Sequence, residues 1–247
     1  MKYIIRILLC SVAALAVVCC GGRKARKEAA AAAEKARLDS IAQAEMILKQ
    51  KQAEITMAAL EDEPVFDIVT NLGTIKVRLY SKTPKHRANF EKLALSGYYD
   101  GLLFHRVING FMIQGGDPFT KDTSMVARYG QGGPDYTVPA EFVPEYRHKK
   151  GALAAARRGD AANPMRESSG SQFYLVQDER ARAQLDGQYT VYGETVEGLD
   201  VIDKIARVAT DRRDMPFNPV RILRIELDEV SKPAPADSTA AAPAPEK

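Results

Sequence analysis

The sequence predicts a mainly β fold, a closed barrel or a sandwich with two helices, preceded by a long N-terminal helix. Short runs of alternating apolar and polar residues, bounded by turn residues, follow one another from Val65 to about Val230. Within that range only two stretches have helical patterning, whereas the stretch before it has the composition of a strong helix former. Many short strands with two helices are typical of a barrel or a sandwich.

The first twenty residues have the pattern of a secretory signal. Lys2 and Arg6 precede an apolar run from Ile7 to Val18, which is shorter than the roughly 17–25 residues of a membrane span. The segment then ends in a cysteine pair and two glycines, which resembles the lipobox of bacterial lipoproteins and favours Cys20, preceded by the small Cys19, as the lipidated residue. We therefore expect a lipid-anchored protein of the bacterial cell envelope that faces the periplasm; an ordinary signal segment is the alternative.

The charge, cysteine and histidine content excludes several classes of function. The 35 Lys and Arg are balanced by 32 Asp and Glu spread along the chain, so no nucleic-acid partner is expected. No cysteine follows Cys20, which excludes a disulfide framework, a thiolate nucleophile and a cysteine-based zinc site in the rest of the chain. His86, His105 and His148 are far apart and lack carboxylates at metal-ligand spacing, so we expect no metal and no cofactor.

Two segments outside the β region have biased composition. Residues 21–63 are rich in Ala, Glu, Lys and Arg and contain no Pro, which predicts a charged helical spacer from Arg23 to about Glu63. Ile41, Leu48 and Ile55 recur every seven residues, so a coiled-coil seam is the alternative to a solvated spacer. Residues 231–247 are mainly Pro and Ala, and we expect a disordered tail there.

The elements of the central domain, residues 64–230, follow from local patterns. Two strands, Val65–Thr70 and Thr74–Leu79, flank a tight turn in which Gly73 supplies a positive φ. A helix then begins after Thr83 as N-cap and stops at Gly97. Further elements are expected as strands at Leu103–Val107, Phe111–Gln114, Gly151–Ala155, Phe173–Val176, Thr190–Tyr192 and Val220–Leu227, and as a helix at Leu199–Arg207.

The segment FHRVINGFMIQGGD, Phe104 to Asp117, resembles the signature of the cyclophilins, the cyclosporin-binding peptidyl-prolyl cis-trans isomerases. Three further segments resemble later motifs of the family in order: SGSQFYL (Ser169–Leu175), LDGQYTVYG (Leu185–Gly193) and VEGLDVIDKI (Val196–Ile205). The resemblance covers roughly Val65 to Glu229. It implies a closed eight-stranded antiparallel barrel capped by two helices, with a groove on its outer face that binds proline-containing polypeptides, unfolded or partly folded.

Carried over residue by residue, the resemblance assigns the catalytic site to His105, Arg106 and Gln114. It assigns substrate binding to Phe111, Met112, Ala156, Arg157, Gln172, Tyr174, Leu185 and Tyr189. Arg106 suits this chemistry, because a guanidinium stays charged and can donate to the proline nitrogen as the peptide bond twists. Each residue also has a plainer explanation: barrel core for the apolar ones, a surface salt bridge for Arg106 and a structural role for His105.

Departures from the family pattern modify these expectations. Gln184 stands where well-known eukaryotic members have a tryptophan that contacts cyclosporin, so we expect cyclosporin to bind weakly. Tyr174 stands where Phe is common, Tyr189 where many members have His, and Arg157 where Asn is frequent. The loop from residue 157 to 169 is longer and more charged than usual, which favours an altered substrate preference.

Two other classes of function are open at this point. A proline-peptide receptor or chaperone would share the fold but would not need Arg106 at the proline nitrogen. A structural or interaction protein would use the helix of residues 23–63 as its functional part.

Overall fold

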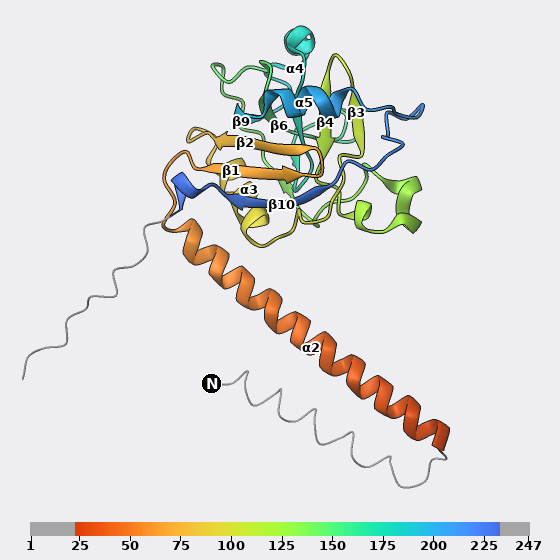
Figure 1. Ribbon diagram of the computed structural model, residues 1–247. Helices are drawn as coiled ribbons and strands as arrows, with labels where there is room; N and C mark the ends of the chain where they lie inside the picture. Colours follow the sequence, from red (N-terminus) through yellow and green to blue (C-terminus); the bar gives the residue numbers. More distant parts are fainter. Residues whose placement is uncertain (1–22, 233–247) are drawn as a thin grey trace, which may run out of the picture. The chain divides into compact units, whose positions relative to one another are not determined.

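The computed structural model describes residues 23–232 of the chain, which divides into two compact units, Met1–Lys49 and Gln50–Lys247 (Figure 1). The signal segment with its three cysteines and the tail from residue 233 lie outside the described residues. The predicted mainly β domain is found in the second unit, and the predicted N-terminal helix is also present.

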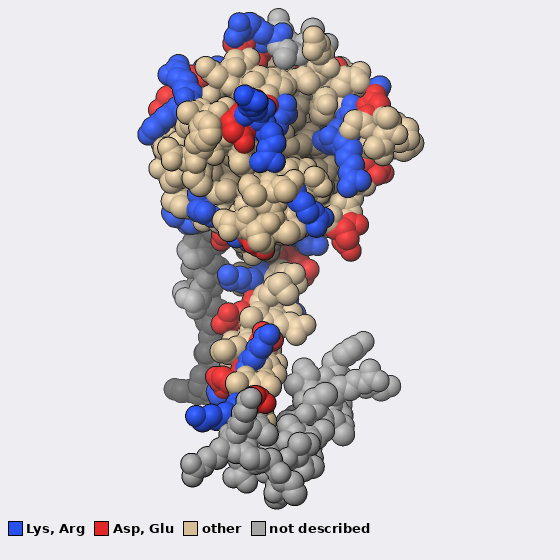
Figure 2. Space-filling model, turned by 90° about the vertical axis from the view of Figure 1, so that its right-hand side faces the viewer, with Lys and Arg blue, Asp and Glu red and all other residues tan. Residues whose placement is uncertain are grey.

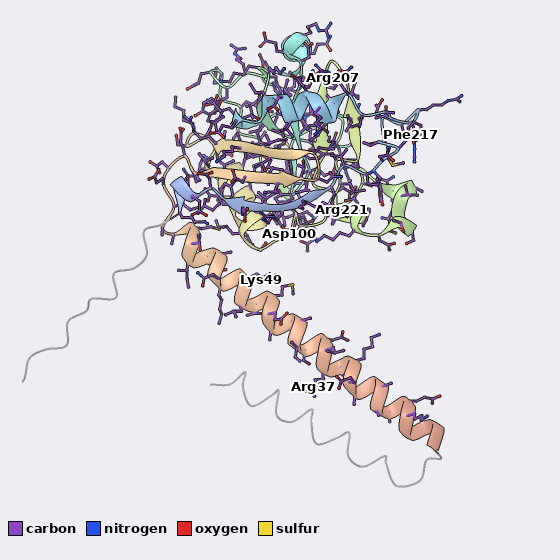
Figure 3. All side chains as sticks on the ribbon, in the orientation of Figure 1. Arg37, Lys49, Asp100, Arg207, Phe217 and Arg221 are labelled. Atoms are coloured by element: carbon purple, nitrogen blue, oxygen red, sulfur yellow. The ribbon has the colours of Figure 1, made fainter. Side chains whose placement is uncertain are left out.

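Helix α2, Arg23–Met57, is the predicted charged helix, although it ends six residues before Glu63 (63 − 57 = 6). Its side chains, such as those of Arg37 and Lys49, project into solvent from residue 27 to residue 52 (Figure 3). Leu48 and Ile55 are exposed as well, so pairing of two copies through these residues stays a prediction. None of the helices between residues 23 and 232 combines the length and apolar composition needed to cross a membrane.

The domain is built on an eight-stranded antiparallel sheet of order β10-β1-β2-β9-β6-β8-β4-β3, with a separate β5-β7 pair. The strands are β1 Val65–Thr70, β2 Gly73–Leu79, β3 Arg106–Ile108, β4 Met112–Gly115, β5 Thr137–Val138, β6 Ala152–Ala155, β7 Ser168–Ser169, β8 Phe173–Val176, β9 Val191–Glu197 and β10 Ile222–Leu227. The two-residue strands β5 and β7 were not predicted, because two residues carry no alternation signal.

The expected complete closure of the barrel is not confirmed. Strands β10 and β3 form the two edges of the sheet, so the sheet is an open half-barrel. Three backbone hydrogen bonds join the chain just before β3 to the start of β10: Gly101 N donates to Ile222 O (2.8 Å), Phe104 N donates to Val220 O (2.9 Å) and Ile222 N donates to Leu102 O (2.8 Å). Leu103 and Arg221 form an isolated antiparallel bridge there, but no ladder joins strands β3 and β10.

Alternation along the central strands separates two apolar clusters. On one face the side chains form the main core with α3, Pro84–Leu95, and α5, Leu199–Ala206; this face carries Ile113, Leu153, Phe173 and Leu175. On the other face a smaller cluster contains Met112, Ala154, Tyr174 and Val176. Because both faces are buried, these strands have continuous apolar runs instead of strict alternation. We call the second set, with the partly buried rings packed on it, the outer cluster.

The start of α3 differs from the expectation. Thr83 makes no side-chain capping bond; the carboxylate of Glu141, far along the chain, accepts from the backbone N–H groups of Lys85 and His86 at 3.0 Å each. The His86 ring also contacts Glu141 (2.6 Å) and the Ser168 hydroxyl (2.9 Å). A local sequence pattern cannot detect a cap supplied by a distant loop.

The chain just past the predicted domain end at residue 230 contacts the start of β1. Ser231 is buried in the short 3-10 turn Glu229–Ser231, and its hydroxyl accepts a hydrogen bond from the backbone N–H of Val65 at 2.9 Å. The start of β1 and this C-terminal turn are therefore bonded to each other.

The turn after β4 depends on Gly116 and Asp117. Gly116 has φ +89°, and an added Cβ would collide with the carbonyl oxygen of Ser171. The Asp117 carboxylate is fully buried and accepts from the backbone N–H groups of Phe119 (2.8 Å), Gly130 and Gly132 (3.2 Å). One carboxylate therefore holds both ends of the loop that runs from residue 118 to 132.

Replacing Gly116 by Ala should destabilise the domain by about 2–4 kcal/mol, because strained backbone and a steric collision add. Urea denaturation followed by circular dichroism measures this loss. Gly159→Ala is the matched control, since Gly159 has open space around it and an ordinary φ. If the two variants unfold at the same urea concentration, the close approach of Gly116 to Ser171 is not a stability determinant.

Candidate functional site

Three of the predicted site residues occupy one row across the sheet. Arg106 on β3 pairs with Gln114 on β4, Gln114 pairs with Tyr174 on β8, and Tyr174 pairs with Ala154 on β6. Directly paired residues point to the same side of a sheet, and neighbouring strands lie about 4.8 Å apart. The three polar side chains therefore lie side by side on the face that carries the outer cluster.

Arg106 is held at one edge of its guanidinium. Its Nε lies 3.5 Å from Oδ2 of Asp214, and its side chain is 44% exposed. The loop after α5 places Asp214 there: the Asp214 carbonyl accepts from Val107 N (2.8 Å), and the Asp211 carboxylate accepts from the backbone N–H of Met215 (3.0 Å). The two terminal nitrogens of Arg106 make no hydrogen bond to any described residue, so they are free for a ligand.

Gln114 is fixed by a short chain of amides. Its Nε2 donates to Oε1 of Gln172 at 3.0 Å. The Nε2 of Gln172 in turn donates to the carbonyl oxygens of Gly130 (3.1 Å) and Gly132 (2.7 Å). A primary amide has two N–H donors, so the second donor of Gln114 stays available for a carbonyl oxygen.

The outer cluster supplies an apolar surface beside this row. Met112, Tyr174 and Ala156 are buried in it, and the rings of Phe111 and Tyr189 pack on it half-buried. The Tyr174 and Tyr189 rings meet edge to face at 6.1 Å between centroids. Leu185 is half-buried at the end of the short helix α4, Arg182–Leu185, which was not predicted. The structure thus brings the predicted proline-pocket rings together from segments more than sixty residues apart (174 − 111 = 63).

His105, predicted beside Arg106, is buried with 6% of its surface exposed. Neither ring nitrogen makes a hydrogen bond of normal geometry within the described chain, and the backbone of Gly130 passes next to Nε2. Burial lowers the pKa of His105 to about 4, with the nearby Asp117 charge and the Leu103 backbone opposing the shift. The ring is therefore neutral at physiological pH and supports the loop instead of lying open beside Arg106.

The hydroxyl of Tyr174 belongs to a network that the sequence did not indicate. It lies 2.9 Å from Nε2 of His148, whose Nδ1 lies 2.8 Å from Oδ1 of Asp186. Burial lowers the pKa of the His148 ring, and Asp186 opposes this. Since the carboxylate can only accept, Nδ1 carries the proton and Nε2 accepts from the Tyr174 hydroxyl.

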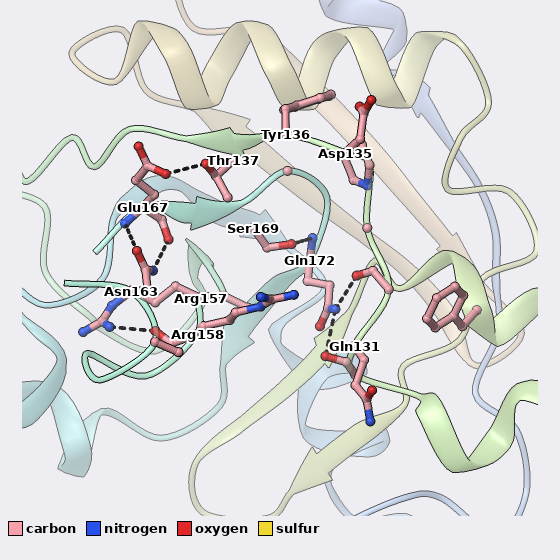
Figure 4. A pocket seen from close by; sticks show the side chains of 18 of the residues that line it. Gln131, Asp135, Tyr136, Thr137, Arg157, Arg158, Asn163, Glu167, Ser169 and Gln172 are labelled. Atoms are coloured by element: carbon pink, nitrogen blue, oxygen red, sulfur yellow. Dashed lines mark hydrogen bonds between the residues drawn. The ribbon is translucent and has the colours of Figure 1, made fainter. Parts of the chain in front are cut away.

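A pocket of about 600 Å³ opens next to the row (Figure 4). Four of the predicted residues line it: Gln114, Ala156, Arg157 and Gln172. Its other walls come mainly from residues 130–137 and from the long loop of residues 157–169. Glu167 of that loop accepts hydrogen bonds from the Thr137 hydroxyl and from the Asn163 side-chain amide. The sequence signalled that loop by its length and charge, but it gave no sign of the 130–137 wall.

The site shows no electrostatic pattern of a metal or polyanion site. Among residues 23–232 no group of three His, Cys, Asp or Glu side chains is placed to hold a metal ion. On the face of the folded domain seen in Figure 2, basic and acidic side chains are interspersed with uncharged ones. The expectation that the protein uses no cofactor stays a prediction.

The comparisons with known proteins identify a family. The model of the "Cyclophilin type peptidyl-prolyl cis-trans isomerase/CLD" family matches residues 65–227. The chain is 34% identical over 166 residues to "Peptidyl-prolyl cis-trans isomerase CYP18-2" of Arabidopsis thaliana, covering 66% of this chain and 93% of the relative. It is 38% identical over 165 residues to "Peptidyl-prolyl cis-trans isomerase-like 2" of Rhizopus delemar, but spans only 28% of that longer protein.

Solved structures agree with this assignment. The crystal structure of a cyclophilin type peptidyl-prolyl cis-trans isomerase from Cryptosporidium parvum has a TM-score of 0.59 and 30% sequence identity, and it covers 67% of this chain and 98% of its own. A second crystal structure of that protein was determined in the presence of the dipeptide Ala-Pro.

The low pKa of His105 predicts a specific loss of stability in acid. From pH 6.5 down to about 4 the unfolded chain binds a proton at this position that the folded chain does not bind. His105 therefore lowers the free energy of unfolding by about 3 kcal/mol over this window. Titration of its ring signals by NMR should show a neutral imidazole until about pH 4. In His105→Gln the free energy of unfolding should fall less steeply over the same pH range, and an unchanged slope would contradict the assignment.

Proposed function

Since the chain belongs to the cyclophilin-type peptidyl-prolyl cis-trans isomerases, we propose that its domain of residues 65–227 catalyses rotation about X-Pro peptide bonds on the outer face of β3, β4 and β8. The observation that carries the proposal is the row of Arg106, Gln114 and Tyr174, with the outer cluster beside it. A cationic donor and an amide donor thus stand next to an apolar surface suited to a pyrrolidine ring.

The chemistry needs no covalent step. Rotation faces a barrier of about 18–20 kcal/mol, because it breaks the resonance of the peptide bond. At the twisted transition state the proline nitrogen regains its lone pair, so a donor aimed at that nitrogen binds the transition state better than the ground state. In this proposal the free terminal nitrogens of Arg106 donate to it, Asp214 fixes the guanidinium, and Gln114 donates to a substrate carbonyl.

A rate gain of about 10⁵ would require the site to lower the barrier by about 7 kcal/mol. One charge-assisted hydrogen bond contributes only part of this, so the proline pocket must orient the ring as well. The substrates in this proposal are proline-containing polypeptides that are unfolded or partly folded. The Ala-Pro dipeptide used with the Cryptosporidium relative fits the same chemistry. Weak cyclosporin binding stays a prediction, and Gln184 is exposed.

We also propose that the protein acts in the bacterial cell envelope, anchored by a lipid on Cys20 and facing the periplasm. The support is the basic, apolar and cysteine-containing pattern of the first residues, which lie outside the described structure. The exposed charged helix α2 would then serve as a spacer between the anchor and the domain.

Arg106→Ala should reduce kcat/KM for a proline tetrapeptide by about 10²–10³-fold, because one preorganised donor to the transition state is lost. A protease-coupled isomerisation assay on the full chain measures this. Asp214→Asn should keep the Arg106 guanidinium but weaken the contact that orients it, and we expect about a tenfold reduction in kcat/KM.

Arg224→Ala is the matched control, since Arg224 lies on β10 in an exposed ion pair with Glu226. Circular dichroism verifies that each variant is folded. A folded wild-type protein that accelerates none of several X-Pro peptides would contradict the enzyme and favour the proline-peptide receptor.

The lipid anchor predicts that Cys20→Ser abolishes incorporation of labelled palmitate and releases the protein from the membrane fraction of a bacterial host. Cys19→Ser should retain both, because the lipobox pattern favours Cys20. Equal labelling of Cys20→Ser and wild type would contradict lipidation at this residue.

A further inference from the structure

Arg157 makes contacts that a surface arginine would not make. Its side chain is only 4% exposed, although it lies in the loop that follows β6. Its Nε donates to the carbonyl oxygen of Gln188 (2.8 Å), and its terminal nitrogen donates to Asp160 (2.6 Å) and to the carbonyl of Arg158 (2.9 Å). The guanidinium is therefore fixed in plane and position by three separate acceptors.

The fixed guanidinium lies over an aromatic ring. The Arg157 Cζ is 4.5 Å from the centroid of the Tyr189 ring. A cation at this distance from a ring face attracts the ring, and the attraction grows when both groups are removed from water. Tyr189 also meets Tyr174 edge to face and packs on the outer cluster, so its ring contacts both Arg157 and that cluster.

The segment that carries Tyr189, residues 185–189, is also held in place at Asp186. Asp186 accepts from the backbone N–H of His148 (2.9 Å), contacts the His148 ring (2.8 Å), and pairs with Arg147 (3.3 Å). Residues 185–189 thus bridge two attachments, one at Asp186 and one at Gln188. The second attachment comes from Arg157, the residue whose guanidinium lies over the Tyr189 ring.

We propose that Arg157 is a positioning residue that acts through Tyr189: its guanidinium fixes the Tyr189 ring as one wall of the proline pocket and so sets the affinity for prolyl peptides. The inference rests on the proposed function. It joins two departures from the family pattern, Arg157 and Tyr189, in one structural contact. It also gives the Arg157 side chain a role other than the direct substrate binding that the resemblance assigns to this residue. Arg157 also lines the 600 Å³ pocket, together with Gln114, Ala156 and Gln172.

The test is a double-mutant cycle on the full chain. Arg157→Gln should raise KM for a proline tetrapeptide by about tenfold with little change in kcat, because ground state and transition state lose the same wall. Tyr189→Leu removes the ring, so adding Arg157→Gln to it should raise KM no further. Arg157→Lys keeps a cation that can pair with Asp160 but loses the guanidinium over the Tyr189 ring and the bond to Gln188, and should also raise KM.

A control variant and two further measurements separate positioning from folding. The control Arg224→Gln removes the same charge from an exposed ion pair and should leave KM unchanged. NMR of ring-labelled tyrosine, with the Tyr189 signal assigned through Tyr189→Phe, should show the signal shifted and averaged in Arg157→Gln. The thermal unfolding midpoint of each variant shows whether the domain is intact.

The outcomes distinguish the two proposals. An equal KM increase when Arg157→Gln is added to the wild type and to Tyr189→Leu, or an unchanged Tyr189 signal in a folded Arg157→Gln, overturns the positioning role. If the wild type does not isomerise peptides, the proposed function fails, and NMR titration with the same tetrapeptide then decides the positioning role. Weaker binding of the tetrapeptide to Arg157→Gln than to the wild type supports that role. Equal affinity overturns it.

Discussion

The register of four neighbouring strands is the constraint on which the rest of the structure depends. In β3, β4, β8 and β6 every second residue enters the main core, and the residues between them form the outer cluster with Arg106 and Gln114 beside it. A slip of one residue would turn Arg106, Gln114 and Tyr174 into the core and bring Ile113 and Leu175 out. Because burying an unpaired cation costs far more than exposing an apolar side chain, the apolar pattern fixes the register and the register assembles the site.

Buried polar groups then attach the long loops to this sheet. Asp117 holds the loop that passes over His105. Glu141 caps the start of α3 and binds His86, whose ring contacts the hydroxyl of Ser168 on β7. Each carboxylate accepts several N–H groups, so its charge is compensated although it is removed from water. Burial alone would raise the pKa of Glu141, but the hydrogen bonds from His86 and Lys85 hold it below its usual value. The pocket walls are therefore fixed by electrostatics where the sheet itself does not reach.

The site combines the row of Arg106, Gln114 and Tyr174 on the sheet with the ring of Tyr189, which lies on a loop and is contacted by Arg157. Asp214 lies 3.5 Å from the Arg106 guanidinium, and Gln172 accepts a hydrogen bond from Gln114, so both donors have a partner that orients them before any peptide arrives. Such preorganisation is what a reaction without covalent chemistry requires, because the protein has only binding and electrostatics with which to lower the barrier. Arg157 extends the same principle to Tyr189, since a guanidinium with three fixed acceptors can hold a ring that the sheet does not contain.

The sequence by itself determined the strands of the eight-stranded sheet, helices α3 and α5 and the long charged helix, because alternation, turn glycines and helix-forming composition are local properties. The segment from Phe104 to Asp117 also indicated the family and, with the later motifs, most of the site residues. Tertiary structure alone decided what depends on distant partners: the open edge between β3 and β10, the Glu141 cap in place of Thr83, the burial of His105, and the contact of Asp214 with Arg106. It also decided that Arg157 stacks on Tyr189. These features join residues far apart in the chain, and a hydrogen bond or ring contact between them leaves no periodic signal in either segment.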